Sequence, residues 1–295
     1  MSRDPRRTGA ATRDGARSGV QRPRGVRTPA PVGSTMGSLT RRALLTGLGL
    51  GAAAVLVKCA ADGQPTGSGP APEPVLAAGP DLDRVPVPPG ALTALPPEAG
   101  DVMAWTVDDG TDSAVVAAYT AFAARSGIRL TYFVNGTYAS WDETADAIRP
   151  LVESGQIQLA NHTWSHPDLT TLDDAGIQAE LQRNHDYLAS VYGVDARPYF
   201  RPPYGLHDAR VDAAAAAIGY TVPTLWYGSL GDSGELSQQA IIDLAVEWFA
   251  AGRIIIGHLN HDPVTYVFPR LESLLDERGL TTVTLNDVFT SEQHP

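Results

Sequence analysis

The chain has 295 residues, a hydrophobic content of 43% and a net charge of −11. The charge is divided unevenly. The first 45 residues carry ten Arg against two Asp, whereas the residues after Cys59 carry eleven Arg and no Lys against 31 acidic residues. So acidic a region disfavours nucleic acid and anionic lipid as binding partners.

The N-terminal third of the chain has the composition of leader and linker sequences. Residues 1–35 are rich in Arg, Gly, Pro, Ser and Thr, so they predict a disordered basic leader that cannot offset its ordering entropy by burying apolar surface. Met36 is an alternative start of the natural chain. Residues 61–95 are rich in Pro, Ala and Gly and predict a linker. Residues 96–290 are then left for a single α/β domain.

Residues 36–60 have the pattern of an export signal. Arg41 and Arg42 precede an apolar run at 44–57, and a basic segment before a short apolar core is typical of secreted precursors. The paired arginines resemble a twin-arginine signal. We therefore expect an exported protein that is extracellular or associated with the cell envelope. A membrane anchor helix is the alternative, although the run is shorter than the roughly twenty residues that a span requires.

Cys59 is the only cysteine, so an intramolecular disulfide is excluded. It lies where a bacterial lipoprotein would carry its lipid, but Lys58 precedes it where that pattern has a small residue. Two interpretations remain open at this position. One is a lipid tether to the membrane at the N-terminus, and the other is an incidental cysteine in a leader that is removed.

The remaining chain alternates short β-rich runs with longer helical segments. This alternation predicts parallel strands, arranged in an open doubly wound sheet or in a closed barrel. Polar clusters follow five of the strands directly, which favours a barrel, because barrels draw their functional residues from many strand ends. The expected strands are 102–107, 130–134, 157–161, 199–201, 221–226, 254–257 and 280–285, and the expected helices are 113–126, 142–154, 173–192, 208–218, 237–251 and 268–278.

The first and third of these strands end in residues that favour metal ions. Asp108 and Asp109 end the first strand, and adjacent carboxylates repel each other unless a cation lies nearby. His162 and His166 follow the third strand with a spacing that lets both rings face one point. Two imidazoles and one carboxylate leave open positions, as a catalytic zinc-type site requires. The alternative is that both histidines are ordinary loop residues.

Four segments resemble, in order and spacing, motifs of the polysaccharide deacetylases, the NodB-homology family of carbohydrate esterases. Thr-Val-Asp-Asp-Gly at 106–110 is similar to the first motif, and His-Thr-Trp-Ser-His at 162–166 to the second. Phe-Arg-Pro-Pro-Tyr-Gly at 200–205 is similar to the third, and Ile-Gly-His at 256–258 to the fifth. The resemblance covers about 102–288. It implies a distorted (β/α)7 barrel, one divalent metal, and hydrolysis of N-acetyl groups on an aminosugar polymer such as peptidoglycan or a chitin-like oligosaccharide.

The resemblance also implies the ligands of that metal. Asp109, His162 and His166 would hold the ion, which we expect to be Zn2+, with Co2+, Ni2+, Fe2+ or Mn2+ as alternatives. An ion held there would polarise the acetamide carbonyl and lower the pKa of a bound water. These are the same residues that the spacing alone favours as ligands.

The remaining motif residues receive roles in proton transfer and charge stabilisation. Asp108 would be the general base, and His258 would be the general acid that protonates the leaving amine. Arg201 resembles the arginine that orients the base, and the backbone N–H of Tyr204 would help to stabilise the oxyanion. Each residue taken alone also has a structural interpretation: a helix cap for Asp108, an ion pair for Arg201 and a packed core residue for His258.

The fourth motif departs from the family, which has two Asp three residues apart followed by Trp. Here Ser229 stands at the first position, Asp232 matches the second, and Ser233 replaces the aromatic residue. Asp232 would raise the pKa of His258 by its negative charge. Aromatic residues beside the motifs could stack on sugar rings, with core packing as the alternative, which is favoured for Trp226. These residues are Trp164, Tyr204, Trp226 and Tyr227.

Two other functions remain open from the sequence. The altered fourth motif is compatible with a carbohydrate-binding protein that keeps the barrel but has little activity. The metal-ligand pattern is also compatible with a hydrolase of non-sugar amides or acetyl esters. The sequence makes no prediction about the oligomeric state.

Overall fold

The computed structural model describes residues 78–290. The predicted leader, the export signal, Cys59 and the first part of the linker therefore lie outside the described residues. Among the residues described, none of the helices has both the length and the apolar character needed to span a bilayer.

A curled sheet of seven parallel strands forms the centre of the domain. Its hydrogen-bonded order is β6-β5-β4-β3-β2-β7, and β8 pairs with the start of β2. All seven predicted strands are confirmed, although the fourth, fifth and seventh are shorter than expected. The strands are β2 (Val102–Asp109), β3 (Leu130–Val134), β4 (Ile157–Asn161), β5 (Tyr199–Phe200), β6 (Val222–Pro223), β7 (Ile254–His258) and β8 (Thr281–Thr282).

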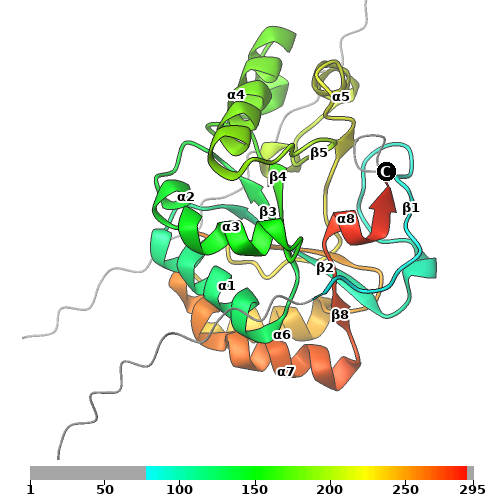
Figure 1. The fold of residues 1–295 in the computed structure, drawn as a ribbon, viewed down its shortest axis with the longest axis vertical. Coiled ribbons are helices and arrows are strands. Elements are labelled where there is room, and N and C mark those ends of the chain that lie inside the picture. Colours follow the sequence, from blue (N-terminus) through cyan, green and yellow to red (C-terminus); the bar gives the residue numbers. More distant parts are fainter. Residues whose placement is uncertain (1–77, 291–295) are drawn as a thin grey trace, which may run out of the picture. The chain divides into compact units, whose positions relative to one another are not determined.

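The helices connect successive strands and lie around the outside of the sheet (Figure 1), with α4 and α5 at the top of the view and α1, α6 and α7 at the bottom. The helix predicted at 142–154 is divided in two at Thr144. The α-helices are α1 (Ser113–Ser126), α2 (Ser140–Glu143), α3 (Ala145–Glu153), α4 (Asp174–Tyr192), α5 (Ala209–Ala216), α6 (Gln238–Trp248), α7 (Phe268–Arg278) and α8 (Leu285–Val288), and the 3-10 helices are η1 (Pro97–Ala99), η2 (Leu169–Thr171), η3 (Pro203–Gly205) and η4 (Asp262–Val267).

The helix that follows the first long strand shows how local sequence fixes these boundaries. The side chain of Asp112 accepts hydrogen bonds from the backbone N–H groups of Ala114 and Val115 and so caps the first turn of α1. Gly127 ends the helix in the left-handed conformation, at φ 74°. The next strand then begins after a short turn, which keeps β2 and β3 adjacent.

The sheet is a distorted (β/α)7 barrel, as the family resemblance implies, and its gap lies between β6 and β7. On the carboxyl side, the chain after β6 closes this gap, because Tyr227 N donates to Ile254 O at 2.8 Å and Leu230 N donates to Ile256 O at 2.9 Å. On the other side, the segment 92–95 fills it. Leu92 N donates to Pro223 O at 2.8 Å, and Leu95 N donates to Gly252 O at 2.8 Å.

This segment lies within the stretch predicted as a linker and packs into the domain. Leu92 is 1% exposed and Leu95 is 5% exposed, so both belong to the core. Further upstream, β1 (Val85–Pro86) pairs in parallel with β9 (Phe289–Thr290). A Pro-rich composition predicts an extended chain, but it does not reveal that isolated leucines in such a chain complete a barrel wall.

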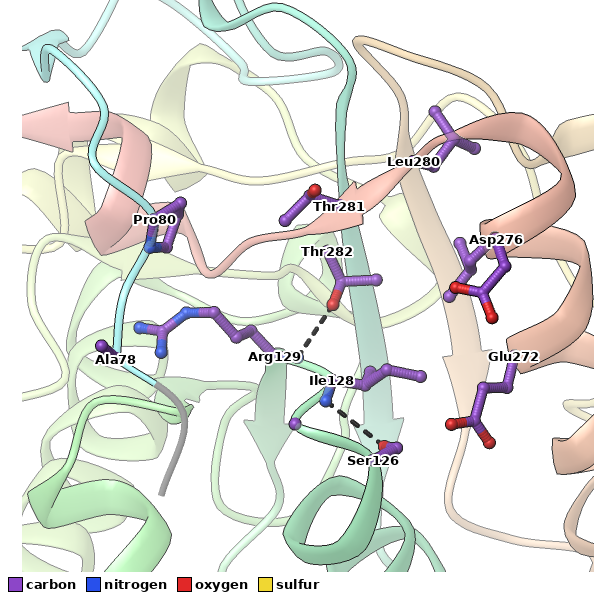
Figure 2. A pocket seen from close by; sticks show the side chains of 12 residues that line it. Ala78, Pro80, Ser126, Ile128, Arg129, Glu272, Asp276, Leu280, Thr281 and Thr282 are labelled. Atoms are coloured by element: carbon purple, nitrogen blue, oxygen red, sulfur yellow. Dashed lines mark hydrogen bonds between the residues drawn. The ribbon is translucent and has the colours of Figure 1, made fainter. Parts of the chain in front are cut away.

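Arg129 links the segment before β3 to β8 and α8, at the end of the barrel opposite the carboxyl ends of the strands. Its side chain is buried, and the residue is 5% exposed. Its Nε and Nη2 donate to the two carboxylate oxygens of Asp287 on α8, each at 2.7 Å. Its backbone N–H donates to the hydroxyl of Thr282 at 2.9 Å, as Figure 2 shows. The small cavity beside it, about 260 Å³, is thus bordered by an arginine that is already paired.

Strand alternation separates the apolar residues into two layers. Met103, Trp105 and Val107 of β2 point outward and pack under the helices, where Trp105 contacts Tyr119, Phe122 and Phe249. The intervening residues point into the barrel, beginning with Val102 and Ala104. The same period of two carries Thr106 and then Asp108 to the inner face at the carboxyl end of the strand.

The role of the segment 92–95 in the barrel is tested by Leu92→Ala. We expect a loss of about 3 kcal/mol in the free energy of unfolding, because the truncation leaves a cavity in a buried contact. The measurement is urea unfolding of the full chain followed by circular dichroism. Leu206→Ala is the matched control, since Leu206 is 47% exposed and its truncation should change stability by less than about 0.5 kcal/mol. Equal stability of the two variants would exclude the segment from the fold.

Candidate active site

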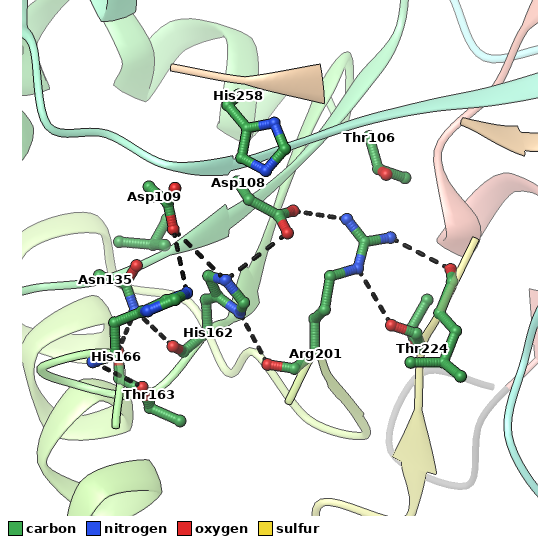
Figure 3. A network of polar contacts seen from close by, with 12 residues as sticks. Thr106, Asp108, Asp109, Asn135, His162, Thr163, His166, Arg201, Thr224 and His258 are labelled. Atoms are coloured by element: carbon green, nitrogen blue, oxygen red, sulfur yellow. Dashed lines mark hydrogen bonds and ion pairs between the residues drawn. The ribbon is translucent and has the colours of Figure 1, made fainter. Parts of the chain in front are cut away.

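Four of the predicted site residues converge because they share the inner face of the barrel. Asp108, His162, Arg201 and His258 each continue the inward-facing register at the carboxyl end of β2, β4, β5 and β7, respectively. Figure 3 shows their side chains directed toward one another from these separate strands. A cavity of about 470 Å³ opens there, and Asp108, Asp109 and His258 line it.

The three predicted metal ligands also converge. Asp109 Oδ1 lies 3.4 Å from His162 Nε2 and 3.6 Å from His166 Nε2. The three ligand atoms all lie within 4.8 Å of one another, which is close enough to surround one cation. Among the described residues, Asp109 Oδ1 is buried and has no hydrogen-bond partner.

The hydrogen bonds of His162 fit a metal site. Its Nδ1 lies 2.7 Å from the carbonyl oxygen of Arg201, and because a carbonyl can only accept, Nδ1 carries the proton. The lone pair of Nε2 in the neutral ring would then face Asp109 Oδ1 and Asp108 Oδ2, which is 3.5 Å away. Electron pairs facing each other at these distances require a proton or a metal ion between them.

The pKa shifts show that a positive charge is stabilised at this position: burial acts to lower the pKa of His162, but Asp108 and Asp109 outweigh it and raise that pKa, so a proton on His162 takes the place between the groups that a metal ion would fill. Burial acts to raise the pKa of the Asp109 carboxyl, but His162 and the Asn260 amide outweigh it and hold that pKa far below its usual value. Burial, together with the nearby charge of His162, lowers the pKa of His166. Asp109 is therefore ionised and His166 neutral, and these are the states in which each binds a metal.

The backbone around the site adopts an unusual conformation. Among the described residues, the only non-glycine residues with positive φ are Asp109, Thr163, His166 and Tyr204, and all four belong to this site. Such conformations cost about 1–3 kcal/mol each and persist only where the surroundings enforce them. The strain identifies the site independently of the motifs.

Neighbouring side chains enforce this geometry. Trp141 Nε1 donates to the carbonyl of Asp109 at 3.1 Å, and the side-chain amide of Asn135 donates to the carbonyls of His162 and Thr163. Gly110 has φ 98°, and a Cβ at this position would lie 2.4 Å from the Trp141 ring. Only glycine fits this turn, for both reasons.

Arg201 lies behind Asp108, as the family resemblance implies. It is fully buried, and its Nη1 donates to Asp108 Oδ1 at 2.5 Å. Its Nε donates to Thr224 O at 3.0 Å, and its guanidinium lies 3.9 Å from the centre of the Phe133 ring. The arginine is thus fixed by three contacts and in turn fixes the carboxylate of Asp108.

Asp232 lies behind His258 in the same way. His258 Nδ1 lies 3.1 Å from Asp232 Oδ1, so Nδ1 donates and Nε2 is left for the cavity. Burial acts to lower the pKa of His258, but the hydrogen bond to Asp232 and the charge of Asp108 outweigh it and raise that pKa above its usual value. The protonated form of His258 is favoured.

The remaining predicted residues divide between the cavity and other surfaces. Tyr204 and Trp226 line the cavity, as do Ser229 and Ser233 of the altered fourth motif. Trp164 instead packs edge-on against Tyr187 and under Arg183. Tyr227 lies against Trp248 and Arg253. Neither Trp164 nor Tyr227 is among the residues that line the cavity, although both were expected to lie where a sugar ring could stack on them.

Two amides at this site were not predicted from the sequence. Asn135 follows β3 directly, and Asn260 follows His258 by two residues; Asn260 Nδ2 donates to Asp109 Oδ2 at 2.6 Å. Polar residues at the carboxyl end of a parallel strand are the signal that could have indicated both. Their partners, however, could not be read from the sequence.

A parallel barrel with polar residues at its strand ends defines a broad class of proteins, and comparison with known proteins narrows it. The model of the family Polysaccharide deacetylase matches residues 96–223. A chitin deacetylase of Arthroderma benhamiae is 29% identical over 205 residues, which cover 65% of this chain and 52% of that protein. The chain spans about half the length of the curated relatives that it matches. The domain matched at residues 96–223 belongs to the polysaccharide deacetylase family.

Solved structures share this fold. The family 4 carbohydrate esterase from Streptomyces lividans, in complex with acetate, aligns with a TM-score of 0.55 and 26% identity over 62% of this chain and 92% of that one. A family 4 pseudoenzyme from Bacillus anthracis aligns with a TM-score of 0.60 and 16% identity over 68% of this chain and 69% of that one. At that identity the second likeness shows the fold alone.

The hydrogen bond between Asp232 and His258 predicts a change in titration. Asp232→Asn removes a contact that raises the pKa of His258, so that pKa should fall. The measurement is an NMR titration of the His258 imidazole in the folded protein. Asp276→Asn, an exposed change at the other end of the barrel, is the control and should leave the titration unaltered. An unchanged pKa in the Asp232 variant would exclude this coupling.

Proposed function

We propose that the protein is a metal-dependent hydrolase that removes N-acetyl groups from an aminosugar polymer. One observation carries the proposal: Asp109, His162 and His166 surround a common point, with Asp108 and His258 beside it on the wall of the same cavity. A divalent ion, for which we propose Zn2+, would be held by the three ligands; when bound, it polarises the acetamide carbonyl and acidifies a water.

Asp108 has the position of the general base. Its Oδ1 is bound by Arg201 and its Oδ2 faces the metal ligands, so Oδ2 can take a proton from a water that attacks the carbonyl carbon. The buried guanidinium keeps Asp108 oriented. The backbone N–H of Tyr204, on the rim of the cavity, would stabilise the oxyanion that this attack forms.

His258 has the position of the general acid. Its Nδ1 is held by Asp232, and Nε2 would donate its proton to the amide nitrogen as the C–N bond breaks. The products are acetate and a free amine on the sugar. Asp108 then releases the proton that it took from water and His258 takes up a proton again, so both groups return to their starting states. The raised pKa of His258 supports this role, because an acid must be protonated at working pH.

The substrate class follows from the relatives. We propose chitin-like oligosaccharides or peptidoglycan, since the matched proteins include chitin deacetylases and a probable peptidoglycan-N-acetylglucosamine deacetylase. We further propose that the protein acts outside the cytoplasmic membrane, supported by Arg41 and Arg42 before an apolar run. N-terminal sequencing of the mature protein would test this location.

A second candidate function is supported by the fourth motif. Ser229 and Ser233 line the cavity where the family has an Asp and a Trp, so the wall beside His258 differs from that of the family. This difference favours a carbohydrate-binding protein of low activity, or a hydrolase of smaller amides or acetyl esters. The complete set of metal ligands, base and acid favours the deacetylase.

Acetate release from N-acetylglucosamine oligomers tests the proposal. We expect release that is abolished by EDTA and restored by Zn2+, because the ligands alone cannot activate the water. Asp108→Asn should lower kcat by about 10²–10⁴-fold, since it removes the base without removing a metal ligand. Asp276→Asn is the matched control and should retain full activity. Binding of oligomers without release would support the carbohydrate-binding protein, and release only from acetyl esters or small amides would support the hydrolase of those smaller substrates.

The pH dependence of activity gives a separate test of the acid. Activity that needs protonated His258 is lost as the pH rises through its pKa. Asp232→Asn lowers that pKa, so the basic limb of the kcat/KM profile should move to lower pH. A basic limb that stays in place would remove His258 or its coupling to Asp232 from the mechanism.

A further inference from the structure

The two carboxylate oxygens of Asp109 have different surroundings. Oδ1 is buried, faces His162 Nε2 and His166 Nε2, and has no hydrogen-bond partner among the described residues. Oδ2 accepts a hydrogen bond from Asn260 Nδ2 at 2.6 Å. The carboxylate is therefore held from one side and free on the side of the histidines.

The orientation of the Asn260 amide is determined by Thr111. Asn260 Oδ1 lies 3.2 Å from the backbone N of Thr111 and 2.9 Å from its hydroxyl. A backbone N–H can only donate, so the amide oxygen must face Thr111 and the amide NH2 must face Asp109. The chain Thr111–Asn260–Asp109 thus has a defined direction.

This connection spans the turn after β2. Asp109 has φ 75° and Gly110 has φ 98°, and Asn260 joins the residues on either side of that turn. Asn260 also lies on the segment that leaves β7, where Leu259 N donates to Asp108 O at 2.9 Å. The amide therefore ties the turn after β2 to the strand end that carries His258.

The charge of each partner distinguishes the two adjacent aspartates. Asp108 is bound by the cationic guanidinium of Arg201, which compensates its negative charge. Asp109 is bound by a neutral amide, which fixes Oδ2 but leaves the full charge available to a cation at Oδ1. Hydrogen-bonded neutral partners of this kind orient metal ligands and tune their affinity.

We propose that Asn260, oriented by Thr111, is a positioning residue that holds Asp109 as a one-oxygen ligand of the metal. This inference rests on the proposed function, since it concerns the same ion. Without the amide, Oδ2 is released and the strained turn loses a contact on one side. The carboxylate can then rotate, and the ion loses part of its fixed coordination.

The test is metal affinity of the stripped full-length protein, measured by competition with a chromophoric chelator for Zn2+. Asn260→Ala should raise the Kd for Zn2+ by about 10–100-fold, as other partners of metal ligands do. Thr111→Val keeps the shape of the exposed side chain and removes only the hydroxyl donor, so it should raise the Kd by about fivefold. Asn286→Ala, on α8 at the other end of the barrel, is the matched control and should not change the Kd.

A double variant separates positioning from general loosening. If Thr111 acts only through Asn260, the Thr111→Val effect disappears in the Asn260→Ala background. Additive effects would overturn the proposal, as would a Kd in Asn260→Ala equal to that of the natural protein. Should Asn260→Ala fail to fold, Thr111→Val against Asn286→Ala decides the question. A natural protein that binds no Zn2+ would overturn both this inference and the metal site, whereas tight binding without acetate release would overturn the deacetylase function alone.

Discussion

Two adjacent residues of a β-strand point to opposite faces of the sheet, yet this site needs the side chains of Asp108 and Asp109 on the same side. The chain meets this requirement by leaving strand geometry at Asp109, where φ is 75°. The rest of the site follows from that turn: glycine at 110, the tryptophan packed on it, and the amides that bind the surrounding carbonyls. The conformation costs about 1–3 kcal/mol, which the well-packed barrel can supply.

The proposed reacting groups share one design, in which each side chain at the cavity is held by a residue behind it. Arg201 holds Asp108, Asp232 holds His258, and Asn260 holds Asp109. Asp108 and Asp109 are the same type of residue at the end of the same strand, so it is the partner of each that gives it a different chemical role. The three cavity residues therefore have partners of different charge: a cationic guanidinium, an anionic carboxylate and a neutral amide. Electrostatic preorganisation of this kind is the largest contribution to many enzymatic rates.

The sequence predicted the strands and the motif residues well because each depends on local pattern. Hydrophobic runs, terminal glycines and polar residues at strand ends are visible along the chain, and a barrel brings those ends together whatever its details. The segment 92–95 and the strand pair β1 and β9 were missed, since isolated leucines in a Pro-rich stretch carry no period. Trp164 and Tyr227 lie outside the lining of the cavity, because proximity in sequence does not fix the direction of a ring.

A pseudoenzyme of carbohydrate esterase family 4 shares this fold, so the fold alone does not determine the reaction. In this chain the proposed metal ligands, base and acid are all present at the carboxyl ends of the strands, whereas the departures from the family motif lie at Ser229 and Ser233 on the cavity wall. Buried groups set proton and metal chemistry, and wall residues contact whatever part of the substrate enters. The two serines replace a charge and an aromatic face with small hydroxyls, so they leave more room and offer weaker stacking. A change in which polymer or acyl group fits is therefore a more direct consequence of the altered motif than a loss of the reaction itself.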